Sequence, residues 1–439
     1  MSPLRIVYLL LTHLLAPIVI AIEGWRELRN RDQRGRLKQR LGFVLPQPRP
    51  GCLWIHAVSV GEVQAAAALV RELRRCVPGI EIVLSTVTAT GAERARAIFG
   101  MELRHCYLPY DLPGAVGRFL DRIRPRAVIV LETEIWPTLY RAIDRRGIPL
   151  VMASARMSER SVSRYRRMAS LVRDALSGDV SIGAQSAADA VRFKALGAPA
   201  DRVRVTGNVK FDLEIPAPVV AAGRELRSVC AAGRPVWIAG STHEGEEAAA
   251  LEAHAAVRSR YPSALLLLVP RHPQRFEAVR ALLDKGGHSY ARRSAGALPA
   301  HGEEVFLVDT IGELQMFYAA ADAAFVGGSL VPVGGHSLLE PAVLGLPVIS
   351  GPWTHNAPEV AELLARAGAL TTVRNGEELA RRVVECLDDP ARGRADGAKG
   401  REAVAANRGA GQRVVAMVLP LLRASASAAA VEPGSSGSR

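Results

Sequence analysis

Cysteine and aromatic side chains are scarce in this chain of 439 residues, and their scarcity argues against several kinds of site. The five cysteines, Cys52, Cys76, Cys106, Cys230 and Cys386, are scattered and never form a C-x-x-C pair. Because a disulfide framework or a zinc site needs grouped cysteines, we expect free thiols in a reducing compartment. Aromatic residues make up 5% of the chain and no basic stretch is interleaved with them. This argues against a surface that stacks single-stranded nucleic acid.

Acidic side chains are also in the minority, with 43 Asp and Glu against 56 Lys and Arg, so that the net charge is +13. A charge of this sign favours acidic partners, such as nucleic acid, an anionic membrane or a phosphorylated substrate. The chain is too long for one ordinary hydrophobic core, so we expect two domains.

The longest uncharged run near the N-terminus is Ile6–Ile22, which is short for a membrane-spanning helix. A basic run follows it, formed by Arg26, Arg29, Arg31, Arg34, Arg36, Lys38 and Arg40. Positive flanks stay on the cytoplasmic side, which argues against a cleaved signal peptide. We predict a membrane anchor over residues 1–24 and a basic juxtamembrane segment over residues 25–50. A helix that lies in the membrane interface is an open alternative, because His13 and Pro17 interrupt the run.

Short apolar runs alternate with amphipathic stretches from residue 52 onward. The predicted strands are Leu53–Val58, Ile80–Ser85, Ala127–Leu131, Leu150–Ala153, Val203–Thr206, Val236–Ala239, Ala264–Val269, Val305–Val308, Ala323–Val326 and Leu346–Ile349. This alternation predicts an α/β protein with two Rossmann-like domains, over residues 51–215 and 216–422, that face each other across a cleft. Residues 423–439 are rich in Ala, Ser and Gly, and we expect a disordered tail there.

The stretch Ala323–Gly351 combines a predicted strand, two glycine pairs and a predicted helix start. Gly334 and Gly335 precede His336, and Ser337-x-x-Glu340 has the spacing of a capping box. Glycines let the backbone approach a ligand, and a helix start attracts phosphate. The alternative, a tight turn with a capping Glu340, has about equal weight on this stretch alone.

A second capping-box pattern, Ser59-x-x-Glu62, follows the first predicted strand. Because ligands bind beyond the carboxyl ends of strands in open α/β sheets, Glu62 is also a candidate general base. Glu132 and Glu134 follow another strand of this sheet and would project to one side if the strand continued. They are candidate site carboxylates or simple caps.

Two cations follow strands of the same domain and complete its candidate site. Arg156 follows Leu150–Ala153, and Lys210 follows the last strand of the first domain. Arg156 has the geometry to bind a phosphate or carboxylate with two hydrogen bonds. Solvated surface charges are the alternative for both.

Polar clusters also follow the strands of the second domain, at Ser241–Glu246, Pro270–Pro273 and Asp309–Leu314. No cluster has metal-ligand spacing, so His243 and Glu244 are interpreted as hydrogen-bonding groups. The candidate donor-side residues are Ser241, His243, Glu244, Pro270, Arg271, His272, Gly312, Glu313, Gly334, Gly335, His336, Ser337 and Glu340.

Taken together, these motifs resemble the 3-deoxy-D-manno-octulosonic acid (Kdo) transferases of lipopolysaccharide synthesis, which have the GT-B fold. The matching stretches are His56–Glu62, Leu108–Asp111, Glu132–Pro137, Ser154–Arg156, Ser241–Glu246, Pro270–Pro273, Gly312–Leu314, Phe325–Leu330 and Gly334–Glu340. The likeness runs from the N-terminal anchor to about residue 420. Two departures concern donor contacts: Ser337 and Leu338 stand where Asn and Pro are common, and the Trp353–Asn356 segment differs from the usual aromatic pattern.

The resemblance implies that Kdo passes from CMP-Kdo to a hydroxyl of the lipid A precursor lipid IVA, with inversion and without a metal. CMP-Kdo is then a co-substrate, and no cofactor is expected. Glu62 is implied as the base, and Arg271, Gly312, Ser337 and Glu340 are implied at the CMP moiety. The candidates on the acceptor side are Ser59, Gly61, Glu132, Glu134, Arg156 and Lys210. The phosphates and acyl chains of the acceptor suit the positive charge and the anchor. We therefore expect a protein at the cytoplasmic face of the inner membrane, with membrane lipids and no nucleic acid as partners.

Two rival functions are weighed against this one. A UDP-sugar epimerase of GT-B-like fold shares the two-domain architecture but has no need of an anchor. A bilobal solute-binding protein predicts a cleaved signal and a periplasmic location, which the basic run and the unpaired cysteines oppose.

Overall fold

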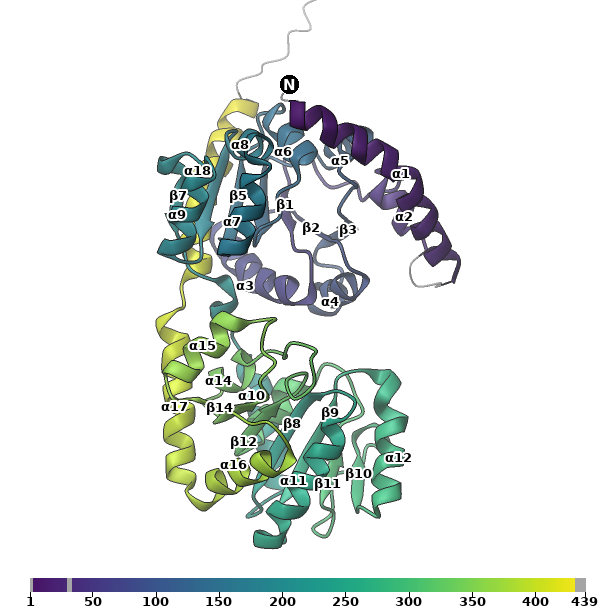
Figure 1. Cartoon of the computed structure of the whole chain (residues 1–439), viewed down its shortest axis with the longest axis vertical. Helices are drawn as coiled ribbons and strands as arrows, with labels where there is room; N and C mark the ends of the chain where they lie inside the picture. The colour runs from purple at the N-terminus through teal and green to yellow at the C-terminus, as the bar shows by residue number, and fades with distance from the viewer. Residues whose placement is uncertain (1–2, 30–33, 431–439) are drawn as a thin grey trace, which may run out of the picture. The chain divides into compact units, whose positions relative to one another are not determined.

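The computed structural model describes residues 3–29 and 34–430. It divides the chain into two compact units: unit 1 holds residues 1–212 together with 407–439, and unit 2 holds residues 213–406. Each unit is built on one parallel sheet covered by helices (Figure 1). The predicted α/β class, with two Rossmann-like domains, is confirmed. All five cysteines are free thiols, as expected.

The sheet of unit 1 has seven parallel strands in the order β3-β2-β1-β4-β5-β6-β7. Its strands are β1 Leu53–His56, β2 Ile82–Thr86, β3 Arg104–Tyr107, β4 Ala127–Leu131, β5 Leu150–Ala155, β6 Val180–Ala184 and β7 Val203–Val205. Its helices are α1 Pro3–Arg29, α2 Arg36–Arg40, α3 Val60–Cys76, α4 Ala89–Phe99, α5 Pro113–Ile123, α6 Pro137–Asp144, α7 Glu159–Arg166, α8 Ala169–Leu176, α9 Ala187–Ala195 and α18 Ala410–Ala430, with short 3-10 helices η2 Ala200–Arg202 and η3 Val209–Asp212.

The sheet of unit 2 also has seven parallel strands, in the order β10-β11-β9-β8-β12-β13-β14. Its strands are β8 Val236–Thr242, β9 Leu265–Pro270, β10 Tyr290–Arg292, β11 Val305–Leu307, β12 Ala323–Val326, β13 Val348–Ser350 and β14 Leu370–Thr372. Its helices are α10 Ala217–Cys230, α11 Glu246–Arg260, α12 Phe276–Gly286, α13 Leu314–Ala319, α14 Leu339–Val343, α15 Pro358–Arg366, α16 Gly376–Asp388 and α17 Pro390–Ala406, with 3-10 helices η4 Pro273–Arg275 and η5 Arg293–Ala295.

The strand predictions are confirmed in position, and each sheet has two strands more than predicted. β3, β6, β10 and β14 were missed because polar or small residues interrupt their apolar runs. Apart from β7, the strands that were found are buried on both faces, and such strands form continuous apolar runs in the sequence. In β1, Trp54 packs with α5 on one face, while Leu53 and Ile55 pack with α3 on the other.

The last described helix, α18, corrects the predicted domain boundary. Val414, Val415, Val418 and Leu422 of α18 are buried in the apolar cluster that covers the α3 face of the unit 1 sheet. Residues 407–422 therefore belong to unit 1, although they were predicted in the second domain. The predicted tail also begins too early, since α18 extends to Ala430. Residues 431–439 lie outside the described residues.

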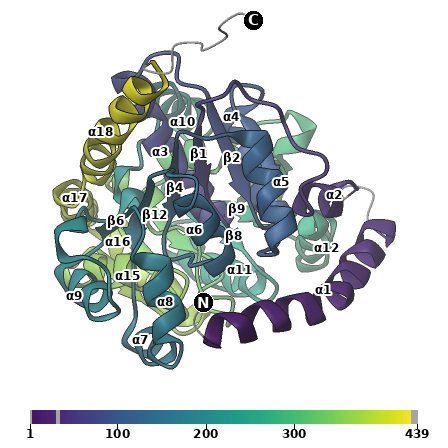
Figure 2. The ribbon, with the colours of Figure 1, turned by 90° about the horizontal axis from the view of Figure 1, so that it is seen from above.

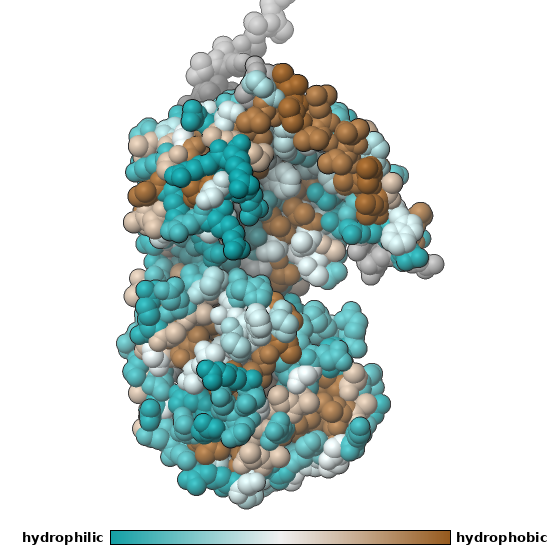
Figure 3. Space-filling model, in the orientation of Figure 1, coloured by the Kyte–Doolittle hydropathy of each residue, from teal (hydrophilic) through white to brown (hydrophobic). Residues whose placement is uncertain are grey.

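Helix α1 is longer than the predicted anchor and rests on unit 1. Figures 1 and 2 show it at the margin of the unit, with its N-terminal end beside α6 and α8 and its C-terminal end beside α2. Its Tyr8 hydroxyl donates to Asp111 Oδ2 at 2.6 Å, and Glu23 pairs with Arg36 at 3.7 Å. The opposite face is an apolar stripe, seen in brown in Figure 3, formed by Leu4, Ile6, Val7, Leu10, Leu11, Leu14, Leu15, Ile18, Val19, Ile22 and Trp25.

The basic run after α1 is only partly a solvated flank. Arg40 is buried, donates to the Leu108 carbonyl and lies over the Tyr110 ring. Arg36 faces Glu23 and donates to the Val87 carbonyl. The Arg36 and Arg40 side chains therefore both bind groups of unit 1. Arg31 lies outside the described residues.

Replacing Leu422 by Ala tests whether α18 completes the core of unit 1. Leu422 is 4% exposed, and loss of a buried leucine side chain costs about 2 kcal/mol or more. Urea unfolding should show this loss, and hydrogen exchange should rise in peptides of β1 and β4. Leu298→Ala is the control, because Leu298 is 41% exposed and its replacement should cost less than about 0.5 kcal/mol. Faster exchange confined to β8 and β12 would contradict the assignment.

Candidate active site

Several of the predicted site residues follow the strands between which the strand order of each sheet reverses. In unit 1 this point lies between β1 and β4, and in unit 2 between β8 and β12. Chains diverge to opposite sides of the sheet there and leave a crevice at the carboxyl ends of the strands. Glu62 follows β1 and Glu132 follows β4, while His243 follows β8 and His336 belongs to the loop after β12.

Glu62 lies in the first turn of α3 and is 7% exposed. Its Oε2 accepts the Val58 N–H at 2.7 Å, and its Oε1 accepts the Ser59 hydroxyl at 3.0 Å. Ser59 is the N-cap residue, but its side chain caps no backbone N–H, and Glu62 accepts the N–H of Val58, one residue before the N-cap, so the predicted capping box does not form. Gly61, beside Glu62 on the same turn, is exposed and has open space where a side chain would be.

Burial raises the pKa of Glu62 to about 7, and the negative charge of Glu132 acts in the same direction. The hydrogen bonds from Val58 and Ser59 oppose this rise, and the charge of Glu134 adds to it. A carboxylate with this pKa takes up a proton near neutral pH, as a general base requires. Accepting the Val58 N–H and acting as a base are therefore compatible roles of one side chain.

The strand before Glu132 and Glu134 does not continue, so the condition under which both would project to one side is not met. Strand β4 ends at Leu131, and Glu132 has a φ of 59°, in the left-handed region. Lys210 Nζ lies 2.5 Å from Glu132 Oε1, so these two predicted residues form an ion pair. Glu134 is half-buried, and burial raises its pKa.

Arg156 is exposed directly after β5, beside this group of charges. Its backbone N–H donates to Thr133 Oγ1 at 3.0 Å, and the Thr133 hydroxyl donates in turn to the Arg156 carbonyl. Thr133 lies between the two glutamates that follow β4. The loops after β4 and β5 are thereby joined at the edge that carries Glu62 and Lys210.

On unit 2 the glycine loop after β12 has a different role from the predicted phosphate cradle. The N–H groups of Gly334 and Gly335 both donate to the Gly328 carbonyl, at 3.0 and 2.7 Å. Gly334 has a φ of 112°, and a Cβ there would lie 2.7 Å from atoms of the Asn356 side chain. These glycines therefore close the loop on itself, and their amides are occupied.

Three histidines meet at the same edge of unit 2. His243 Nε2 lies 2.7 Å from His336 Nε2, and the edge of the His272 ring faces His243. Burial lowers the pKa of His336 to about 3, with the charge of Arg271 acting in the same direction, and burial also lowers the pKa of His243. The lowered pKa values favour the neutral form of both rings, in which the N–H of one Nε2 donates a hydrogen bond to the unprotonated Nε2 of the other. Arg271 follows Pro270, the last residue of β9, and its N–H donates to the Thr242 carbonyl.

Glu246 is the residue of this edge that the sequence analysis did not select. It is fully buried, and its two oxygens accept the N–H groups of His243, Gly328, Ser329 and Leu330 at 2.6–2.9 Å. It thus joins the loops after β8 and β12. The local signal was a glutamate in the first turn of α11 after Gly245, but the sequence cannot show that a second loop supplies three of the four donors.

The remaining donor-side predictions fall into two groups. Glu244 pairs with Arg275 at 3.3 Å, and Glu313 pairs with Arg293 at 2.6 Å beside the exposed Gly312, so both carboxylates bind cations of the chain itself. Glu340 is buried and accepts the Gln315 amide at 2.8 Å.

The predicted capping box at Ser337 is wrong. The N-cap of α14 is Leu338, no side chain caps the helix, and the helix has only five residues. Ser337 is half-buried beside it, and Ser241, with a φ of 59°, is buried at the end of β8. Among the described residues no group of three or more His, Cys, Asp and Glu side chains has an arrangement suited to a metal ion.

Comparison with known proteins identifies the family to which these sites belong. A profile of the 3-deoxy-D-manno-octulosonic-acid transferase (kdotransferase) family matches residues 35–213. The chain is 40% identical over 421 residues to a 3-deoxy-D-manno-octulosonic acid transferase of Haemophilus influenzae, covering 95% of this chain and 99% of that protein. The chain belongs to the Kdo transferase family.

A second relative agrees with this assignment. The transferase of the same description from Bordetella pertussis is 38% identical over 425 residues, covering 94% of this chain and 98% of the relative. The chain is therefore a Kdo glycosyltransferase of lipopolysaccharide synthesis, as the resemblance implied.

Solved structures support the fold alone. A UDP-GlcNAc 2-epimerase from Neisseria meningitidis superposes with a TM-score of 0.53 at 14% identity, covering 84% of this chain and 99% of that one. Such a likeness agrees with the predicted GT-B fold but does not indicate an activity. Membership of the Kdo transferase family decides against the epimerase and the solute-binding protein.

The raised pKa of Glu62 predicts a dependence of stability on pH. The folded protein holds the Glu62 proton more tightly than the unfolded chain, so this group's contribution is fully present below about pH 4.5 and is lost as the pH rises through about 7. Glu62→Gln cannot titrate. Between pH 4.5 and 7 the unfolding free energy of the wild type should therefore fall relative to that of Glu62→Gln. Above pH 7 the difference between the two proteins should no longer change with pH.

Glu72→Gln, in the same helix, is the matched control for this measurement. The hydrogen bond from Arg75 lowers the pKa of Glu72, so its pH dependence should have the opposite sign. Denaturant unfolding at several pH values measures both variants. Parallel curves for wild type and Glu62→Gln would show that Glu62 has an ordinary pKa.

Proposed function

We propose that the enzyme transfers Kdo from CMP-Kdo to a hydroxyl group of lipid IVA, with Glu62 as general base and with inversion at the anomeric carbon. The observation that carries the proposal is the environment of Glu62, a buried carboxylate at the switch point of unit 1 whose pKa lies near 7. Family membership supports the transfer of Kdo. The identities of the donor, CMP-Kdo, and of the acceptor, lipid IVA, are what we propose in addition.

The proposed step is a single displacement. The acceptor oxygen attacks the anomeric carbon while the bond from that carbon to the phosphate oxygen breaks, and CMP leaves with the bonding electrons. Glu62 takes the proton of the acceptor hydroxyl, for which its Oε atoms must exchange the Ser59 bond for a bond to substrate. Lys210 forms an ion pair with Glu132, whose negative charge favours the protonated form of the base.

The donor is assigned to the carboxyl edge of the unit 2 sheet. Arg271 is the cation proposed for the phosphate, and Glu340 is the acceptor proposed for the ribose hydroxyls. Glu246 has both oxygens bound by backbone N–H groups, so it holds the loops rather than the nucleotide. We infer that the transfer needs no metal, since a base activates the acceptor and a cation receives the leaving phosphate.

We further propose that α1 holds the enzyme on the cytoplasmic face of the inner membrane by lying in the interface. The helix is long and apolar enough to span a membrane. Both of its ends, however, are bound to unit 1, through Tyr8 and Asp111 at one end and Glu23 and Arg36 at the other. A helix of 27 residues held at both ends by one domain presents its side to the lipid, as interfacial helices do. The apolar stripe of α1 suits this position.

Mass analysis of products from CMP-Kdo and lipid IVA tests the reaction, with EDTA present to test the metal. Wild-type protein should add Kdo to lipid IVA in EDTA. Glu62→Gln keeps the shape and the hydrogen bond to Val58, and its single-turnover rate should fall by about two to four orders of magnitude. Binding of CMP should be unchanged. Turnover near wild type in the variant would exclude Glu62 as the base, and Glu134 would be examined next.

Flotation with vesicles of phosphatidylethanolamine and phosphatidylglycerol tests the membrane contact. Leu14 and Ile18 are 72% and 57% exposed on α1, so changing both to Asp should abolish binding without unfolding the protein. Tyr8→Phe is the control: it removes the bond to Asp111 but keeps the apolar stripe, and should still bind vesicles. Equal flotation of the double variant and wild type would refute the proposed contact.

A further inference from the structure

The backbone around Arg156 is held on both sides by side chains from other loops. Thr133 Oγ1 accepts the Arg156 N–H at 3.0 Å and donates to its carbonyl. Asp189 Oδ1 accepts the N–H of Met157 at 2.9 Å, and Arg192 donates to the Met157 carbonyl at 3.1 Å. Both peptide groups that flank the Arg156 Cα are thereby fixed.

Asp189 and Arg192 are themselves held in place. Asp189 is 5% exposed, its Oδ2 accepts the Ser186 hydroxyl at 2.5 Å, and Ser186 caps the start of α9. Arg192 lies 3.7 Å from Asp189 and 3.2 Å from Glu159. The Met157 side chain, 1% exposed, anchors the loop in the core of unit 1.

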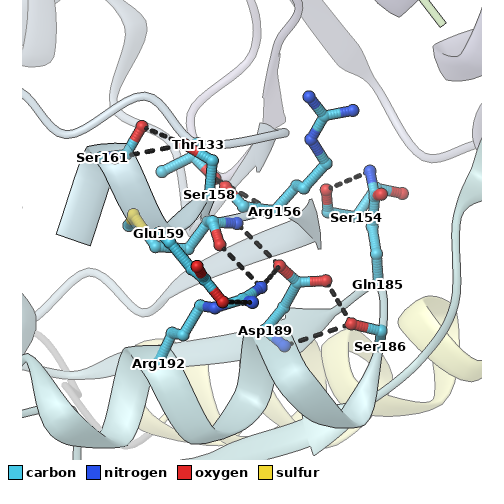
Figure 4. Close-up of polar contacts among 11 residues, drawn as sticks. Thr133, Ser154, Arg156, Ser158, Glu159, Ser161, Gln185, Ser186, Asp189 and Arg192 are labelled. Atoms are coloured by element: carbon cyan, nitrogen blue, oxygen red, sulfur yellow. Dashed lines mark hydrogen bonds and ion pairs between the residues drawn. The ribbon is translucent and has the colours of Figure 1, made fainter. Parts of the chain in front are cut away.

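The Arg156 side chain is the part of this loop that the fixed backbone projects outward. Figure 4 shows its guanidinium directed away from the Asp189 and Arg192 group. Arg156 is exposed and follows β5, next in the sheet to β4, whose following loop carries Glu132 and Glu134. A planar guanidinium on a rigid backbone loses little freedom when it binds a carboxylate or phosphate with two hydrogen bonds.

We propose that Thr133, Asp189 and Arg192 are positioning residues that preorganise Arg156 to bind an oxyanion of a substrate. This inference rests on the proposed function, in which the acceptor carries phosphate groups and the donor sugar carries a carboxylate. The positioning residues touch no substrate themselves, and they act by fixing the backbone from which Arg156 extends.

Double-mutant cycles with Arg156→Ala test the positioning. Arg156→Ala should raise the KM of one substrate about 10- to 100-fold, which corresponds to one charge-assisted hydrogen bond. Thr133→Val and Asp189→Ala should each raise the same KM about three- to tenfold, but should add nothing when Arg156 is already Ala. Thr133→Ser, which keeps the hydroxyl, should restore the wild-type KM. Effects that multiply in the double variants would overturn the proposal.

Arg202→Gln is the matched control for lost stability. Arg202 donates to the Gly178 carbonyl at 2.7 Å and pairs with Asp179 at 3.1 Å, at the opposite end of β6 from the proposed site. Its replacement should lower the melting temperature and leave both KM values unchanged. A rise in KM with Arg202→Gln equal to that with Asp189→Ala would show that general destabilisation explains the effect, and would overturn the positioning role.

The two sources of the oxyanion are distinguished by the substrate that responds. If Arg156 binds a phosphate, Arg156→Ala raises the KM of lipid IVA and has no effect with an acceptor stripped of its phosphates. If it binds the donor carboxylate, the KM of CMP-Kdo rises instead. No change in either KM would overturn the proposal.

A readout without turnover separates this inference from the proposed function. Addition of inorganic phosphate should shift the NMR signal of the Arg156 Nε–H in wild type, and the shift should need several-fold more phosphate in Thr133→Val. Wild-type protein that binds phosphate in this way but transfers no Kdo would refute the proposed function alone. Equal phosphate dependence in wild type and Thr133→Val would refute the positioning role.

Discussion

Beyond the carboxyl end of a parallel strand, backbone N–H groups have no hydrogen-bond partners in the sheet. In this protein, buried carboxylates accept hydrogen bonds from such groups. Glu246 accepts four such groups between the loops after β8 and β12. Asp189 accepts the Met157 N–H after β5, and Asp111 accepts the N–H groups of Thr138 and Leu139 at the start of α6. An unsatisfied buried donor destabilises the folded protein by about as much as a lost hydrogen bond. These carboxylates therefore hold in place the loops that carry the site residues.

The difference between Glu62 and Glu246 shows how the same constraint yields two roles. Glu246 gives both oxygens to backbone donors of two loops and has a purely structural position. Glu62 receives one backbone N–H and one hydroxyl, and the charges of Glu132 and Glu134 oppose its ionisation. Burial, with these two charges acting in the same direction, raises the pKa of Glu62 to about 7, which suits proton transfer. The hydrogen bond from Val58 still fixes the carboxylate at the end of β1.

Unit 1 also separates its polar and apolar contacts along α1. The side of the helix that carries Tyr8 and Glu23 is bound to the protein body, and the apolar stripe is left exposed. Part of the basic run is used in the same way, since Arg36 and Arg40 face the body. The polar side chains of the N-terminal segment thus bind unit 1, and its apolar side chains face the proposed membrane surface.

The sequence by itself determined the features that depend on local pattern. The apolar runs predicted both sheets because strands buried on two faces form continuous hydrophobic stretches. The position of Glu62 after β1 followed from the same runs, and several motifs that occur together in order carried the resemblance to the family. Only the tertiary structure decided which distant groups meet: α18 with the unit 1 sheet, Lys210 with Glu132, Gly334 and Gly335 with the Gly328 carbonyl, and Glu246 with Leu330, 84 residues away. A capping box or a glycine loop has the same sequence whether its donors face a ligand or a neighbouring loop, so their partners are fixed by packing and not by spacing.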